Sequence, residues 1–318
     1  MHILLQDIHK YYGSVKANDG IDLEIKPGSI HGIVGENGAG KSTLMKILAG
    51  YITRTQGTII VNGRPAFFHG PAQAARQGIG MLYQDPLDFP ALTVLENFMA
   101  GLQSGSRNRS AHYAGILAES ARHFGFQLDP RECVRHLTVG ERQQMELLRL
   151  LALGIEVLIL DEPTTGISGS QKDVLFRALK QLAVEQKSII LVSHKLEEIE
   201  ALCDRITVLR RGKVVGVMER PFDTPKLIEW MFGSLPAAPP RGPEAEQMQN
   251  PILSFEEVSA VGGRSGLNRC GVLIQEGEVI GLAGLEGSGQ ELFLRLAAGL
   301  VAPEKGCIQI NREDLTGR

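Results

Sequence analysis

The chain has 318 residues, 43% of them hydrophobic and 22% charged, and its formal net charge is −3. This balance is that of an ordinary globular protein, it gives no sign of nucleic acid as the main partner, and the length suggests two domains, one large and one incomplete. The four cysteines show no CxxC spacing, which argues against a zinc site or a disulfide framework and favours a reducing cytoplasm.

No segment has the features of a targeting sequence or a membrane span. The N-terminal residues MHILLQDIHK do not combine a basic start with a long apolar stretch, as a secretory signal would. No apolar run reaches the roughly 20 residues that a membrane-spanning helix needs. We therefore expect any membrane role to come through a partner.

The first third of the chain alternates predicted strands and helices. Residues 29–35 (SIHGIVG) form an apolar strand that runs into a glycine-rich loop, and residues 41–50 have helical spacing that ends at a glycine. Residues 57–63 and 78–83 are predicted strands. Residues 86–135 are less regular and more helical, which indicates an inserted helical subdomain.

The next hundred residues continue the alternation. Residues 156–163 (EVLILDEP) form a continuous apolar strand, as expected at the centre of a parallel sheet that is covered on both faces. A helix at 171–186, a buried strand at 187–194, a further helix and a hairpin at 205–218 follow. Strand-helix alternation predicts an α/β sandwich, and we assign residues 1–233 to this first domain.

A second segment repeats the start of the first after a linker. Residues 234–251 are rich in proline, alanine and polar residues and have little to bury, which is typical of a linker. From residue 252 to 318, seven residues match the first segment at a constant shift of 249 positions without gaps, a clear internal repeat. The matched pairs are Gly28 with Gly277, Gly35 with Gly284, Gly38 with Gly287, Gly40 with Gly289, Gly50 with Gly299, Gly57 with Gly306 and Asn62 with Asn311.

The sequence GENGAGKST at 35–43 fits the phosphate-loop pattern G-x-x-x-x-G-K-[ST], between a strand and a helix. Glycines allow backbone N–H groups to surround phosphate oxygens, and the helix N-terminus adds partial positive charge. Lys41 would contact the outer phosphates, and the hydroxyl of Ser42 would ligate Mg²⁺. The predicted binding residues are Gly35, Asn37, Gly38, Ala39, Gly40, Lys41, Ser42 and Thr43.

Two carboxylates follow the apolar strand at 156–163. Asp161 ends this strand at the sheet edge where ligands gather in open α/β sheets, and we expect it to help hold Mg²⁺. Glu162 is the better candidate to orient and polarise an attacking water. A strand that ends in Asp-Glu becomes a specific signal only because it lies downstream of the glycine loop.

These motifs together resemble an ATP-binding subunit of an ABC transporter. The resemblance implies that Tyr12 (or its neighbour Tyr11) stacks on adenine, that Gln84 contacts the metal and links to the membrane subunit, and that His194 contacts the γ-phosphate. The segment LTVGERQQ at 137–144 matches the family signature, which serves the ATP site of an opposing domain. The signature residues are Leu137, Thr138, Val139, Gly140 and Glu141.

Within this family, the tandem repeat and the segment ALTVLENFMAG (91–101) resemble the fused double-domain ATPases of bacterial simple-sugar and nucleoside importers. The resemblance implies ATP and Mg²⁺ as cofactors and a peripheral location on the cytoplasmic face of the inner membrane. It implies as partners integral membrane permease subunits, a periplasmic or lipoprotein solute-binding protein, and a second ABC domain or copy. Nucleic acid is not expected as a partner.

Several residues depart from the family pattern. Val139 and Glu141 replace a glycine and a glutamine of the signature, which suggests a weakened contribution to the opposite site. In the second segment, Gln290 and Glu291 stand where Lys41 and Ser42 stand in the first. A glutamine supplies no cation and a glutamate repels phosphate, by at least about 1 kcal/mol even in water. We expect one hydrolytic site and one degenerate site.

The second segment ends before a signature of its own, so we expect a truncated second domain and low isolated activity. Two alternatives stay open from the residues. One is a non-catalytic or incomplete remnant that binds ATP without efficient turnover. The other is an ABC-type ATPase of translation or DNA repair; such proteins usually show basic patches or a long coiled-coil insertion, and the sequence shows neither. The solute is not encoded in this subunit.

Overall fold

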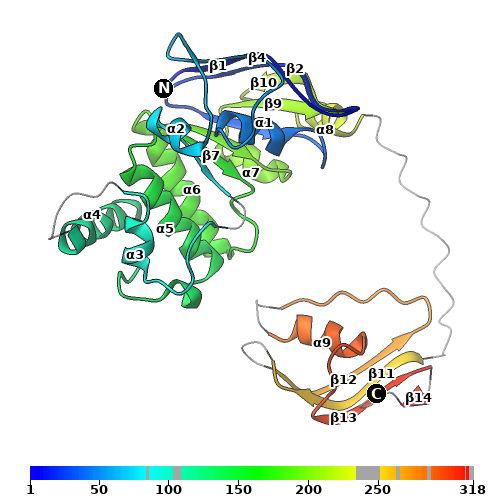
Figure 1. Cartoon of the computed structure of the whole chain (residues 1–318). Helices are drawn as coiled ribbons and strands as arrows, with labels where there is room; N and C mark the ends of the chain where they lie inside the picture. The colour runs from blue at the N-terminus through cyan, green and yellow to red at the C-terminus, as the bar shows by residue number, and fades with distance from the viewer. Residues whose placement is uncertain are drawn as a thin grey trace. The chain divides into compact units, whose positions relative to one another are not determined.

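The computed structural model describes residues 1–83, 86–102, 109–233, 251–262, 266–284, 288–311 and 313–314. The chain divides into two compact units, Met1–Leu235 and Pro236–Arg318, which are coloured blue to yellow-green and yellow to red in Figure 1. We describe each unit by itself.

A six-stranded sheet of order β10-β9-β3-β8-β7-β6 lies at the centre of unit 1. Its strands are β3 (Ile30–Val34), β6 (Ile79–Leu82), β7 (Val157–Asp161), β8 (Ser188–Val192), β9 (Arg205–Arg210) and β10 (Lys213–Glu219). All neighbours pair in parallel except β10, which pairs antiparallel with β9. Arg211 and Gly212 join these two strands with positive φ angles of 50° and 76°, which suits a tight hairpin turn.

Both faces of this sheet are buried, which explains the uninterrupted apolar strands. Successive residues of β7 belong to different cores: Val157 and Ile159 pack into one, Leu158 and Leu160 into the other. The first core also receives α1 (Lys41–Leu48). The second receives α5 (Val139–Ala152), α6 (Gly169–Val184), α7 (Leu196–Leu202) and α8 (Thr224–Phe232). Because strand side chains alternate in direction, a strand covered on both faces must be apolar throughout.

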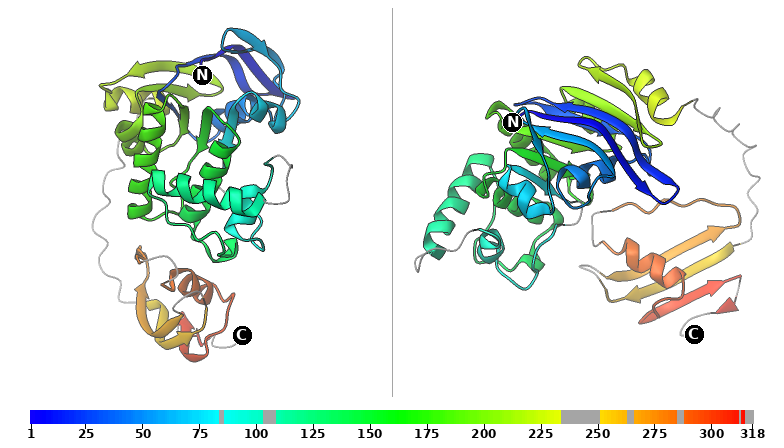
Figure 2. Two further views of the ribbon diagram at one scale, coloured as in Figure 1. Left: turned by 90° about the vertical axis from the view of Figure 1, so that its left-hand side faces the viewer. Right: turned by 45° about the horizontal axis from the view of Figure 1, so that its top comes forward.

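An antiparallel sheet of order β2-β1-β4-β5 covers the face that packs on α1. Its strands are β1 (Ile3–Tyr12), β2 (Val15–Ile25), β4 (Gln56–Val61) and β5 (Arg64–Ala66). Figure 2 shows β1, β2 and β4 as a separate blue layer over the rest of the unit. Only β4 corresponds to a strand that the sequence pattern predicts, at 57–63; β1, β2 and this second sheet were not predicted.

The predicted helical region at 86–135 contains α3 (Val94–Met99), α4 (Arg109–Phe124) and the short 3₁₀ helix Val134–His136. Helices α3 and α4 lie beside α5 at one end of unit 1 (Figure 1). Thr93 starts α3 with a capping box, in which its side chain accepts from the backbone of Glu96 while the Glu96 carboxylate accepts from the Thr93 N–H. This reciprocal bonding satisfies donors that a helix N-terminus leaves free.

Unit 2 repeats the topology of the antiparallel part of unit 1. It contains β11 (Pro251–Ala260), β12 (Leu267–Gln275), α9 (Gln290–Ala297), β13 (Lys305–Ile310) and β14 (Glu313–Asp314), and its sheet order is β12-β11-β13-β14. Backbone geometry repeats with it: Gly40 and Gly289, which precede α1 and α9, have φ angles of 100° and 101°. Asn62 and Asn311 follow β4 and β13 at 49° and 50°.

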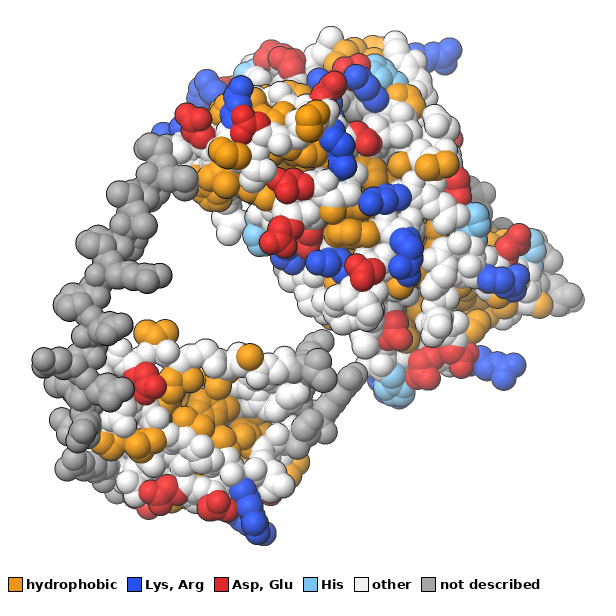
Figure 3. Space-filling view, turned by 180° about the vertical axis from the view of Figure 1, so that it is seen from behind, with side chains coloured by type: hydrophobic (Ala, Val, Ile, Leu, Met, Phe, Trp, Pro, Cys, Tyr) orange, Lys and Arg blue, Asp and Glu red, His pale blue; other side chains and the backbone are white. Residues whose placement is uncertain are grey.

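Unit 2 differs from unit 1 in the run before its glycine loop. Residues 278–284 form no strand, and Val279 is 96% exposed. Its counterpart β3 pairs with β8 and β9 on its two sides, and the described residues of unit 2 include no counterparts of those strands. Hydrophobic side chains reach the surface on the face of unit 2 that Figure 3 shows. Leu294 and Leu300 are also exposed, by 57% and 71%.

Candidate functional site

The glycine-rich loop joins β3 to α1 and leaves no space for a side chain at two of its glycines. A Cβ atom on Gly35 would lie 2.0 Å from the carbonyl oxygen of Leu209, and one on Gly40 would lie 2.3 Å from that of Ala17. Neither position therefore accepts a side chain. Asn37 and Gly38 are exposed at the tip, whereas Ala39 is buried. The loop presents open backbone on one side and is packed against unit 1 on the other.

Lys41, the first residue of α1, folds back over this loop. Its Nζ atom donates to the carbonyl oxygens of Gly35 at 2.7 Å and Glu36 at 2.8 Å, and the side chain is buried. Burial lowers the pKa of Lys41, while the charges of Glu162 and Asp161 act in the opposite direction. The ammonium group thus lies within the electrostatic reach of both carboxylates.

Asp161 and Ser42 form a second pair at the same sheet edge. Burial raises the pKa of Asp161; the Ser42 hydroxyl, which donates to the carboxylate, opposes this rise, and the charge of Glu162 adds to it. Hydroxyl and carboxylate oxygens are suitable ligands for Mg²⁺, which is held in such sites by few protein ligands together with phosphate oxygens. Among the described residues, no group of three or more His, Cys, Asp and Glu side chains forms a separate metal site.

Glu162 and His194 meet directly. Nδ1 of His194 lies 2.8 Å from Oε1 of Glu162, and both side chains are partly exposed. Glu162 has a φ angle of 49°, unusual for a residue with a side chain, and its N–H donates to the carbonyl oxygen of Val192 at 2.9 Å. The ends of β7 and β8 therefore bring these two predicted catalytic residues together.

The signature segment lies at the start of α5, and the N–H and hydroxyl groups of its N-cap residue are hydrogen-bonded within the segment. Thr138 is the N-cap, and its hydroxyl and N–H both donate to Oε2 of Glu141, at 2.8 and 2.7 Å. Gln171, at the start of α6, donates to the Thr138 hydroxyl at 2.8 Å and lies close over Gly140. No hydrogen bond or ion pair among the described residues joins positions 137–141 to the glycine loop at 35–43. The structure does not bring these two motifs together.

The two adjacent tyrosines, Tyr11 and Tyr12, have different surroundings. The hydroxyl of Tyr11 donates to Asp19 at 2.9 Å and lies 2.6 Å from Nδ1 of His9. That hydrogen bond from Tyr11 is the main reason why the pKa of Asp19 falls to about 2. The ring of Tyr12 is half-exposed, and the Lys10 ammonium lies 4.8 Å from its centre.

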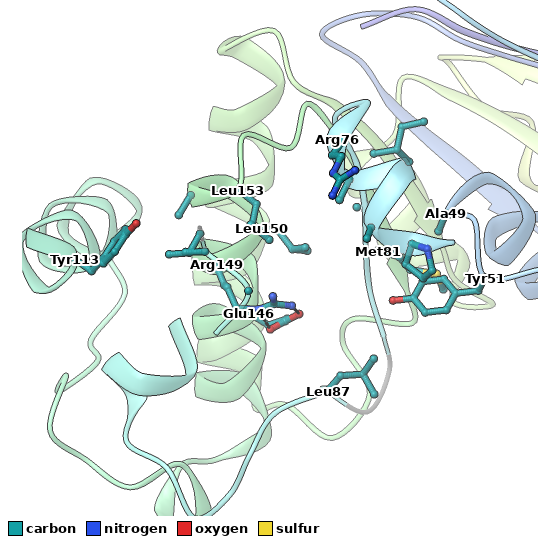
Figure 4. Close-up of a pocket in the computed structure, with 18 residues that line it drawn as sticks. Ala49, Tyr51, Arg76, Met81, Leu87, Tyr113, Glu146, Arg149, Leu150 and Leu153 are labelled. Atoms are coloured by element: carbon teal, nitrogen blue, oxygen red, sulfur yellow. Dashed lines mark hydrogen bonds and ion pairs between the residues drawn. The ribbon is translucent and has the colours of Figure 1, made fainter. Parts of the chain in front are cut away.

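Gln84 lies outside the described residues, but a groove is formed by residues on both sides of it in the chain. This groove has a volume of about 650 Å³ and lies between α5 and Tyr113 on one side and α2 (Pro71–Arg76), β6 and Tyr51 on the other (Figure 4). Arg149 and Glu146 form an ion pair on its wall. Leu87, which is 60% exposed, lies at its edge. No motif of the sequence indicates this groove.

A buried acidic residue next to Glu162 and His194 was also missed. Glu198 on α7 is 3% exposed, and its carboxylate accepts hydrogen bonds from Thr164 and Ser193. The run KLEEIE (195–200) contains three glutamates, and only helical spacing combined with the packing of α7 distinguishes the buried one from its neighbours.

Comparisons with known proteins agree with the resemblance. Residues 18–165 match the sequence profile of the family described as ABC transporter. The chain is 35% identical over 322 residues to the nucleoside import ATP-binding protein NupA of Lactococcus lactis subsp. cremoris, covering 99% of this chain and 63% of that protein. It is 35% identical over 320 residues to the ribose import ATP-binding protein RbsA 3 of Rubrobacter xylanophilus, covering 98% and 63%. The chain thus spans less than two thirds of the length of these relatives.

Solved structures share the fold. A nucleotide-free ATP-binding cassette from an ABC transporter superposes with a TM-score of 0.64 and 22% identity, over 73% of this chain and 100% of that one. A cassette in a dimeric post-hydrolysis state, bound to ADP and Pi, superposes with a TM-score of 0.61 and 21% identity. This match covers 69% of this chain and 100% of that one. These likenesses confirm the predicted α/β P-loop NTPase sandwich. At 21–22% sequence identity they concern the fold alone. Among the described residues, no helix is long and apolar enough to cross a membrane.

Proposed function

The chain carries an ATPase domain of the ABC transporter family, and from that premise we propose that it binds and hydrolyses ATP to power import of a simple sugar or nucleoside. One observation carries the proposal: Lys41, Ser42, Asp161, Glu162 and His194 form a connected set around the end of the glycine loop. The names of the relatives, which are nucleoside and ribose import proteins, support the solute class.

Each residue of this set has a separate task in the proposal. Lys41 exchanges its loop carbonyl partners for phosphate oxygens and neutralises their charge. Ser42 and Asp161 hold Mg²⁺, with Gln84 as a further ligand, and Mg²⁺ when bound withdraws charge from the phosphate oxygens. Glu162 orients water for attack, and His194 holds the Glu162 carboxylate and contacts the terminal phosphate.

The second glycine loop serves as a degenerate partner site in this proposal. Gln290 and Glu291 occupy the positions of Lys41 and Ser42 in the repeat, and the Glu291 side chain is 87% exposed beside Arg295. A site without the lysine cation and with an added carboxylate binds triphosphate weakly. We infer one hydrolytic site and one site that at most holds nucleotide, with residues 252–318 as the N-terminal part of a second, degenerate ABC domain.

The proposed partners follow from the groove and from the family. A helix of a membrane permease subunit fits a groove that is apolar on several walls and carries the Arg149–Glu146 pair. The complex would also contain a periplasmic or lipoprotein solute-binding protein and a second ABC domain or copy. This assembly would hold the chain at the cytoplasmic face of the inner membrane as a peripheral subunit.

The repeat supplies a matched test of the nucleotide site. Lys41→Ala should weaken MgATP binding by about 10- to 100-fold, because a charge-assisted contact to phosphate is lost, whereas Gln290→Ala should leave affinity unchanged. Titration calorimetry of the 318-residue chain measures both. Wild-type affinity in Lys41→Ala would contradict the proposal.

Hydrolysis and transport need separate measurements. Glu162→Gln should bind MgATP like the wild type but hydrolyse it at least about 100-fold more slowly, because a polarising carboxylate is removed. Binding without turnover in the wild type would favour the non-catalytic alternative. Reconstitution with the permease and uptake of a panel of pentoses, hexoses and nucleosides would identify the solute.

A further inference from the structure

Glu198 is a buried carboxylate whose two oxygens bind two different loops. Oε1 accepts a hydrogen bond from the Thr164 hydroxyl at 2.6 Å, and Oε2 accepts one from the Ser193 hydroxyl at 3.1 Å. All three side chains are at least 95% buried. A buried carboxylate is costly unless it is paired and hydrogen-bonded, and both conditions are met here.

The charge of Glu198 is compensated by Lys195. The Lys195 ammonium lies 3.4 Å from Oε1 of Glu198 and donates to the Thr164 hydroxyl at 3.2 Å, while its backbone N–H donates to the Ser193 hydroxyl at 3.1 Å. Every polar side-chain atom of this group therefore interacts with another member. We name Thr164, Ser193, Lys195 and Glu198 the Glu198 network.

The network joins the two loops that carry Glu162 and His194. Thr164 lies two residues after Glu162, and Ser193 directly precedes His194. His194 and Glu162 themselves meet at 2.8 Å, so covalent bonds and hydrogen bonds form a closed ring through both loops. Glu162 also has a strained backbone, which persists only where the surroundings hold it in place. The network supplies such surroundings because it ties the two loops together.

We propose that Glu198 is a positioning residue that fixes the spacing of Glu162 and His194 by holding the Thr164 and Ser193 hydroxyls. Glu198 acts through these loops and does not touch the nucleotide. The proposal deepens the hydrolytic function proposed above and rests on it for its kinetic consequences. The geometric part, that the network holds the Glu162–His194 contact, stands without it.

The test removes the two hydroxyls and keeps the carboxylate. Thr164→Val and Ser193→Ala each detach one loop, and the double variant detaches both; Thr164→Ser retains the hydroxyl. Glu197→Gln is the matched control, because Glu197 lies in the same first turn of α7 but is exposed and outside the network. Fluorescence of Trp230, the sole tryptophan, checks that each variant folds.

The first measurement determines the tautomer of the His194 imidazole in the absence of nucleotide. A neutral imidazole ring that donates from Nδ1 to a carboxylate is held in the Nδ1–H tautomer. Nitrogen-15 NMR, assigned with His194→Gln, should show this tautomer in the wild type, Thr164→Ser and Glu197→Gln. The double variant should shift towards the Nε2–H tautomer, and the single variants should shift partly.

The second measurement separates binding from turnover. The double variant should bind MgATP within about twofold of the wild type, since the glycine loop is untouched, and its kcat should fall about 10- to 100-fold, because misplacing catalytic groups by about 1 Å costs that much. Thr164→Ser should retain most of the activity. An unchanged tautomer in folded variants would overturn the proposal even if their kcat falls. A shifted tautomer in a chain without any turnover would support the positioning role and reject the hydrolytic function.

Discussion

Tyr11 and Tyr12 illustrate how adjacent residues of the same type differ in what they can bind. Tyr11 uses its hydroxyl for Asp19 and His9, so moving it would break a hydrogen-bonded cluster. The Tyr12 ring is half-exposed, and the Tyr12 hydroxyl takes part in no hydrogen bond among the described residues. The resemblance left the choice between them open, and the surroundings of the two rings favour Tyr12 as the adenine-stacking residue.

A leucine at each position tests this choice. Tyr12→Leu should lower ATP affinity about 5- to 100-fold, because stacking of a base on an aromatic ring is worth about 1–3 kcal/mol. Tyr11→Leu should leave affinity unchanged and lower stability instead. Binding of inorganic tripolyphosphate, which has no base, should be unchanged in both. Equal loss of ATP affinity in the two variants would contradict the assignment of Tyr12.

At the scale of elements, α8 is held against β10 by a contact that only glycine permits. Asp223 caps α8, and Leu227 and Met231 bury its inner face. The Trp230 ring lies against Gly216 of β10, so that a Cβ atom there would be 2.4 Å from the ring. Gly216 is therefore required by packing, although it lies in a strand where glycine is otherwise unfavourable.

Two glycine-to-alanine variants should change stability in opposite directions. Gly216→Ala should lower the free energy of unfolding by about 1–3 kcal/mol, because the ring must shift. Gly115 lies on the exposed side of α4, and a Cβ atom there would have no other atom within 4 Å. Gly115→Ala should therefore raise the free energy of unfolding by up to about 1 kcal/mol through helix propensity. Urea unfolding followed by circular dichroism measures both. A neutral Gly216→Ala would show that the contact with Trp230 is not constraining.

At the scale of the whole molecule, the same starting topology occurs in two different contexts. In unit 1, β1 packs over a core shared with the six-stranded sheet. In unit 2, β11 packs over a small core with α9, in which Phe255 and Phe293 stack at 4.6 Å between ring centres. Stability increases with buried apolar surface, so the repeated elements should differ in stability despite their similar backbones.

Hydrogen exchange provides an internal comparison of β1 and β11. Both strands have ten residues and pair antiparallel on both sides. The free energy of opening that exposes the β11 amides to exchange should be lower than that of β1 by about 2 kcal/mol or more, because the described core of unit 2 is smaller. Mass spectrometry of peptides covering 3–12 and 251–260 in the intact chain measures the difference. Equal protection would contradict the expected difference.

The motifs of the sequence were sufficient to predict the fold class and the residues around the glycine loop, because local patterns carry that information. A glycine loop between a strand and a helix, and carboxylates at the end of an apolar strand, follow from side-chain periodicity and backbone freedom. The internal repeat was evident from spacing alone. These features depend on neighbours in the chain, which a sequence displays directly.

Other features exist only through contacts between distant residues. The antiparallel sheet joins residues 3–25 to residues 56–66, and whether the run before each glycine loop becomes a strand depends on partners such as β8 and β9. Glu198 and Glu197 are equivalent in sequence, and only the packing of α7 buries one of them beside Thr164 and Ser193. The sequence by itself determined the family and the positions of its motifs; the tertiary structure decided which side chains meet around those motifs, because burial and pairing depend on the whole fold.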